Sequence, residues 1–293
     1  MSVAELFQHQ HVFIGGLAVR RIKRHKPGRS LTAGDYQRII SAQDAEGIAN
    51  NANALLFPAA PQADYDFALV AQAMAYESLQ RCPALGEDNQ CLIHHHGKPQ
   101  ACAVVPFDPI LPDSLQAVVL LSRGFAENCI VAGEQSDFAV VADHNQVLSD
   151  DYASALQQRR SDLQLEKIIW GQAVFNLLQQ QGFWQSADVM RLSEDNGVFC
   201  LSLVPVLMVL ASVSKISAER CLQYANSQMA LLDKNIELAL QRKNAADKSQ
   251  TKLFRMFNKQ LAQFKQQLSD SSLQPLQHAN DWSNAVESYL FKV

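Results

Sequence analysis

Cysteine and histidine side chains that can bind metal ions lie close together between positions 91 and 102. Their spacing is C-x2-H-x-H-x5-C, and the four residues are Cys91, His94, His96 and Cys102. Thiolate and imidazole are ligands that suit zinc, so one hypothesis is a metal enzyme that uses His94 and His96. On a strand, however, Cys91 and His94 would point to opposite faces, and a polar hairpin tip explains the histidines without a metal. We therefore predict no metal site and no cofactor.

Paired carboxylates are a second source of chemistry, because two of them can act as acid and base. The candidates are Asp108, Asp113, Asp150 and Asp151. Asp150 and Asp151 are more simply explained by the start of a helix, and Asp108 by a turn. Gly15-Gly16 ends a predicted strand, but the sequence contains neither common phosphate-loop pattern, nor G-x-S-x-G. We predict that the protein is not an enzyme and has no catalytic residues.

Residues 20–29 form a basic stretch that holds six of the 25 lysines and arginines. Such side chains bind phosphates, either in nucleic acid or in anionic lipid headgroups. The predicted phosphate or lipid contacts are Arg20, Arg21, Lys23 and Arg24. No aromatic residue is interleaved with them, and the net charge of −4 disfavours a global attraction to nucleic acid. A solvated loop explains the stretch without any function.

Residues 197–214 carry no charge, and thirteen of the sixteen residues from 198 to 213 are apolar. A helix of this length reaches about 27 Å, just under the roughly 30 Å hydrocarbon core of a membrane. We predict a transmembrane helix at 197–214 in the inner membrane, with a cytoplasmic N-terminal domain, although Lys215 and Arg220 favour the opposite orientation. The alternative is a cytoplasmic protein in which this segment is a buried helix, or two core strands that bend at Pro205.

The residues before this run predict an α/β domain at 1–196, in which helices pack on a sheet. The expected strands are 12–19, 91–93, 101–107, 115–121, 128–132 and 138–142, and the expected helices are 32–41, 64–81, 152–164 and 173–181. The domain holds 14 basic and 22 acidic residues. The six cysteines form no C-x-x-C pair. Four of them lie in apolar contexts before residue 130, which suits a reduced, cytosolic N-terminal part.

The residues after the run, 215–293, predict a helical, coiled-coil-like region with 11 basic and 7 acidic residues. Leu222, Met229 and Ile236 repeat every seven residues. Three more apolar residues follow at helical spacing, and they are Phe257, Leu261 and Phe264. All six are predicted to bind a partner subunit or a second copy of the chain. Short seams of this kind also arise when antiparallel helices of one chain pack together, which is the alternative.

The order of these parts resembles the bitopic platform subunits of type IV pilus and type II secretion machines. Residues 117–132 and 138–142, with the helix start at 149–151, are similar to the opening of the second half of an actin-like domain. The resemblance implies a degenerate actin-like cytoplasmic domain. Its phosphate turns would read Ile14-Gly15-Gly16 and Ser122-Arg123-Gly124, and both lack the aspartate of an Asp-x-Gly turn. The resemblance therefore implies docking rather than ATP hydrolysis.

Two hypotheses on function follow from the sequence. The first is a non-enzymatic assembly or scaffold protein of a bacterial envelope machine, a pilus or secretion platform. Its partners would be protein subunits of that membrane assembly, further copies of itself, and the inner membrane. The second is a soluble α/β subunit of a cytosolic complex that binds nucleic acid through residues 20–29. The sequence favours protein partners over nucleic acid.

Overall fold

The computed structural model describes residues 1–33, 36–95, 97–124, 141–143, 145–192, 197–270 and 280–291. The strands are β1 (Ile14–Lys23), β2 (Ser30–Ala33), β3 (Tyr36–Ile39), β4 (Phe57–Pro58), β5 (Tyr65–Met74) and β6 (Val198–Ser202). The helices are α1 (Val3–Gln8), α2 (Ala42–Leu55), α3 (Gln100–Ala103), α4 (Gln116–Gly124), α5 (Asp150–Glu166), α6 (Gln172–Gln180), α7 (Ala187–Met190), α8 (Val204–Ala211), α9 (Lys215–Arg242), α10 (Asp247–Ser269) and α11 (Asn280–Leu290). Short turns of 3₁₀ helix are η1 (Glu77–Leu79), η2 (Asp113–Leu115) and η4 (Phe183–Gln185), and η3 (Lys167–Gly171) is a π-helical turn.

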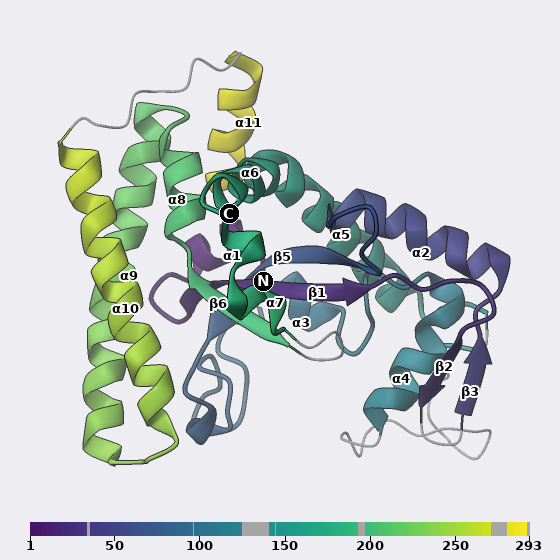
Figure 1. Cartoon of the computed structure of the whole chain (residues 1–293). Helices are drawn as coiled ribbons and strands as arrows, with labels where there is room; N and C mark the ends of the chain where they lie inside the picture. The colour runs from purple at the N-terminus through teal and green to yellow at the C-terminus, as the bar shows by residue number, and fades with distance from the viewer. Residues whose placement is uncertain are drawn as a thin grey trace.

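These elements form a mixed α/β fold with a four-stranded antiparallel sheet and a helical C-terminal region (Figure 1). At this level the predicted class, an α/β part followed by helices, is confirmed. Strand β1 is central in the main sheet, whose order is β4-β5-β1-β6. It pairs with β5 along all ten of its residues, and with β6 from Gly16 to Arg20. The strand predicted at 12–19 is thus confirmed and continues through the basic stretch to Lys23.

The first half of β1 is buried on both of its faces. Leu17 and Val19 point to one face and belong to the largest hydrophobic cluster, while Ala18 is buried on the other. Gly15 permits the close approach of α9, because a Cβ atom there would collide with the hydroxyl of Tyr224. The N–H of Gly15 donates to Oε1 of Gln228 at 2.8 Å. Gly15 is therefore a packing residue and not part of a phosphate turn.

Four sequence predictions for the N-terminal region are wrong. Residues 64–81 contain strand β5 in place of a helix, and residues 32–41 contain strand residues of β2 and β3. Residues 115–121 are helical, and residues 91–107 hold turns and α3 where a hairpin was expected. A strand covered on both faces has a continuous apolar run instead of an alternating pattern. Its period therefore does not distinguish it from a buried helix.

Two predicted helices of this region are confirmed. The helices expected at 152–164 and 173–181 are α5 and α6, each shifted or extended by one or two residues. Of the stretch that carries the actin-like resemblance, residues 117–124 are helical in α4. Residues 125–140, which include the strand expected at 128–132 and most of the one at 138–142, lie outside the described residues. The actin-like relationship stays a prediction.

The uncharged run does not form one helix. Its first part is strand β6, which pairs with β1, and its second part is helix α8. Pro205 lies in the first turn of α8, where its missing N–H removes no helical hydrogen bond. Within the described ranges, no helix is both long and apolar enough to cross a membrane. The predicted span at 197–214 is therefore wrong, and the segment is a half-buried strand at the edge of the sheet followed by a core helix.

Helices α9 and α10 form a long hairpin at one end of the molecule (Figure 1). Their inward side chains belong to the same hydrophobic cluster as β1, α1 and α8. That cluster contains residues from Met1 to Leu290. The regions 1–196 and 215–293 therefore share one core, and the change in charge composition between them does not separate two cores.

Candidate anion-binding face on helix α10

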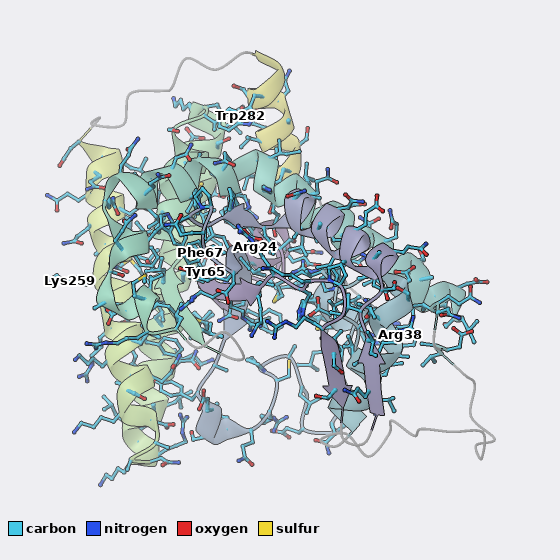
Figure 2. All side chains as sticks on the ribbon, turned by 45° about the vertical axis from the view of Figure 1, so that its right-hand side comes forward. Arg24, Arg38, Tyr65, Phe67, Lys259 and Trp282 are labelled. Carbon is cyan, nitrogen blue, oxygen red and sulfur yellow. The ribbon has the colours of Figure 1, made fainter. Side chains whose placement is uncertain are left out.

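Four basic side chains form a row along the outer face of α10. We call this row the basic stripe, and it consists of Lys248, Lys252, Arg255 and Lys259, all of them exposed. Their intervals of 4, 3 and 4 residues place them on one side of a helix. At a rise of about 1.5 Å per residue, the stripe is about 16 Å long. Figure 2 shows Lys259 directed away from the body of the protein.

The opposite face of α10 fixes the stripe in place. Phe254, Phe257 and Phe264 are almost completely buried in the main core. The hydroxyls of Thr251 and Tyr76 are hydrogen bonded at 3.1 Å, which ties the first half of the helix to the end of β5. At the hairpin turn, Arg242 donates to Oδ2 of Asp247 at 2.8 Å. The stripe is thus presented by a helix that packing holds along its length.

The charges of α10 are unbalanced. The helix contains five lysines and arginines and a single acidic residue, Asp247, which is buried and already paired with Arg242. No stripe side chain forms an ion pair or a hydrogen bond with any other described residue. Like charges three or four residues apart on a helix repel each other by a few tenths of a kcal/mol per pair. The stripe therefore has no anionic counterpart within the described part of the chain.

Two side chains of the basic stretch, residues 20–29, make contacts within the chain. The guanidinium of Arg21 lies 3.7 Å from the centre of the Tyr65 ring and donates to the carbonyl of Leu192 at 3.1 Å. Arg24 donates to both carboxylate oxygens of Asp66, at 3.0 and 2.6 Å, and this hydrogen bonding raises its pKa. Both side chains therefore have partners within the chain.

The other two predicted phosphate contacts, Arg20 and Lys23, are exposed on β1. Figure 1 shows that β1 carries its basic end away from α10. In Figure 2, Arg24 and Tyr65 lie together near the centre of the molecule, apart from Lys259. The basic stretch and the basic stripe therefore do not form one surface.

The predicted metal and carboxylate candidates do not come together as sites. Cys91 and His94 lie in an exposed turn, Cys102 is exposed in α3, and His96 lies outside the described residues. Over the described ranges, no group of three or more metal-binding side chains occurs.

Each predicted carboxylate has its own structural surroundings. Asp113 forms an ion pair with Arg160 at 2.9 Å. Asp108 accepts a hydrogen bond from the N–H of Ile110, as expected of a turn. Asp150 and Asp151 lie in the first turn of α5, as predicted.

The predicted partner-binding residues pack largely inside the chain. Ile236, Phe257, Leu261 and Phe264 are buried in the main core, and Leu222 and Met229 are half-buried. The seam joins α9 and α10 to each other and to the body, which is the intrachain alternative given by the sequence. A role for these six residues in binding a partner stays a prediction.

The basic stripe was not predicted, although its signal is present in the sequence. The apolar residues of α10 and its exposed basic residues both recur at 4-3-4 spacing, on opposite sides of one helix. The excess of positive charge after residue 214 pointed to the same region. Comparison with known protein families, with curated protein sequences and with solved structures finds no similar protein.

Proposed function

We propose that this protein binds nucleic acid and that the basic stripe of α10 holds the phosphate backbone. The observation that carries the proposal is the stripe itself: four exposed cations in one row with no anionic partner among the described residues. Lysine and arginine in such a row replace the counterions that a phosphate backbone otherwise holds. The net charge of −4 does not oppose this, because the attraction is local to one helix face.

A line of phosphates suits the stripe better than the plane of a membrane surface. The positive charge is one helix wide, and Asp233 and Glu237 are exposed on the neighbouring helix α9. Asp233 lies directly beside α10, since it accepts a hydrogen bond from Asn258. An anionic membrane would bring its headgroups against these carboxylates as well as against the lysines. A single backbone can follow α10 and avoid them.

Counterion release determines how strongly the binding affinity should depend on the salt concentration. Four phosphate contacts give a slope of log K against log salt of about −3.6 for duplex and about −2.8 for single strands. Affinity should then fall about 50- to 150-fold between 50 and 200 mM salt. A binding site formed by one or two lysines would lose much less.

The test compares oligonucleotide binding by the wild type and by the triple variant Lys252→Gln, Arg255→Gln, Lys259→Gln. The matched control removes the same charge from exposed positions elsewhere, with Lys98→Gln, Arg191→Gln and Lys234→Gln. We expect the stripe variant to lose most of its affinity at low salt and to show a slope near −1, whereas the control binds like the wild type. Absence of binding by the wild type at low salt overturns the proposal. So does equal binding by the two variants, or binding to anionic vesicles but not to oligonucleotides.

A further inference from the structure

A cavity of about 220 Å³ opens beside the second half of α10. Its walls come from α6, from the consecutive elements β6 and α8, and from α10, which lies much later in the sequence. The apolar part of the wall includes Leu177, Pro205, Met208 and Phe264. None of the described residues that line the cavity carries a charge. A cavity of this kind suits a neutral ligand with apolar surfaces.

The polar part of the wall consists mainly of glutamine side chains. These are Gln181, Gln260, Gln263 and Gln267. The hydroxyl of Ser202 donates to Oε1 of Gln260 at 2.7 Å, which fixes that amide with its carbonyl toward β6. Its NH2 group then remains as a hydrogen-bond donor. A glutamine amide has both donors and an acceptor, so a ligand here meets neutral groups of both kinds.

The cavity and the basic stripe adjoin each other on α10. Gln263 lies one helical turn beyond Lys259, about 6 Å along the axis, and Gln260 follows Lys259 directly. A backbone that follows the stripe therefore arrives at the mouth of the cavity. The part of the nucleic acid that would enter the cavity at this point is a base.

We infer that the cavity receives one unstacked base of a single strand whose phosphates lie on the basic stripe, an inference that rests on the proposed function. A nucleobase has apolar faces and an edge of donors and acceptors, and glutamine pairs with the edge of adenine through two hydrogen bonds. The cavity is smaller than the roughly 300–1,000 Å³ pockets that hold drug-sized ligands, so it suits one ring system. A paired and stacked base does not reach such a cavity, which makes single-stranded nucleic acid the ligand class.

The experiment measures the affinity of the whole chain for three labelled oligonucleotides of one length. They are single-stranded oligoadenylate, the same strand in duplex form, and a single strand of abasic nucleotides, which keeps the phosphates and lacks the bases. The variant is Gln263→Leu, which replaces the amide with an apolar group. The control is Gln266→Leu, because Gln266 is exposed on the same helix and is not part of the cavity wall.

We expect the wild type and the control to bind the adenine strand more tightly than the abasic strand, by about 5- to 100-fold. Gln263→Leu should lose most of this preference and keep the salt dependence that the stripe produces. Equal binding of adenine, abasic and duplex ligands overturns the inference, and so does an unchanged preference in Gln263→Leu. In those cases the proposed function still stands if the stripe variant loses binding. If no oligonucleotide binds at low salt, both fail together.

Discussion

The hydroxyl of Tyr289 donates a 2.6 Å hydrogen bond to Oε1 of Glu166 in the interior of the protein. The same oxygen accepts the N–H of Val3 at 2.6 Å and the indole N–H of Trp170 at 3.3 Å. One carboxylate thus joins α1, the junction of α5 with the π-helical turn η3, and α11. Burial raises the pKa of Glu166, and burial beside Glu166 raises that of Tyr289.

Replacement of Tyr289 by phenylalanine should destabilise the fold. The hydroxyl also accepts the N–H of Ala4 at 3.1 Å, so its loss leaves a buried donor without a partner and weakens the Glu166 contacts. We expect a loss of about 1–3 kcal/mol in the free energy of unfolding, measured with urea. Tyr152→Phe is the control, because its hydroxyl has no hydrogen bond within the described residues, and it should cost below about 0.5 kcal/mol. Equal effects of the two changes would show that the Tyr289 hydroxyl contributes little.

Glu166 should make stability depend on pH. Its pKa in the folded chain is raised above the ordinary value of about 4.3, so the folded chain holds this proton more tightly than the unfolded chain does. The stabilisation that results is complete at low pH, where the carboxyl group is protonated. This contribution is lost as the pH rises through the folded pKa, because burial penalises the charged carboxylate.

Glu166→Gln lacks this titration. The free energy of unfolding of the wild type should therefore fall relative to that of the variant as the pH rises above about 4. An increase in the free energy of unfolding of the wild type, relative to that of Glu166→Gln, as the pH rises would contradict the prediction. It would show that the positive charges near Glu166, Arg159 and the ammonium of Met1, outweigh its burial.

Leu207 is fully buried in α8, so a charge at this position should prevent folding. Leu207→Arg is expected to accumulate as aggregate, since an unpaired buried charge is among the most destabilising changes. Leu207→Ala, which adds no charge, should cost about 2–5 kcal/mol in urea unfolding. Ile216→Ala, at a position that is 52% exposed, should be nearly neutral. A folded Leu207→Arg that only loses membrane binding would restore the predicted span at 197–214.

Lys252→Glu should stabilise the protein and weaken its binding. Lys252 has Lys248 four residues before it and Arg255 three residues after it, so the change converts two repulsive pairs into attractive ones. We expect a gain of about 0.5–1 kcal/mol at low salt, which salt diminishes. Lys234→Glu on α9 is the control. It should destabilise the protein, because it places a second glutamate three residues before Glu237. A stabilised variant that binds oligonucleotides like the wild type would exclude Lys252 from the binding face.

The sequence predicted best those elements that show one face to solvent. Helix α10 alternates buried phenylalanines with exposed lysines, and this contrast makes its period visible. Strand β5 has neighbours on both sides and is largely covered, so its apolar residues run together and suggest a helix. In residues 197–214 the uniform composition hides the change from strand to helix, which depends on pairing with β1.

The candidate site could be predicted in part. The basic stripe is a local pattern and is legible from the spacing of Lys248 to Lys259. The cavity is not, because Leu177, Ser202 and Gln263 meet only after α6, β6 and α10 have packed together. No pattern within one element indicates such a meeting. The contacts that Arg21 and Arg24 make within the chain are equally non-local, since their partners are Leu192 and Asp66.

The position of β1 between β5 and β6 has a consequence for how the chain is made. Residue 198, the first of β6, leaves the ribosome about 9 to 35 s after residue 23, the last of β1, at a rate of roughly 5–20 residues per second. Throughout that interval one edge of an apolar strand is open on the nascent polypeptide. Strand pairings between such distant segments form slowly, so β1 cannot complete its pairing until its second neighbour has been synthesised.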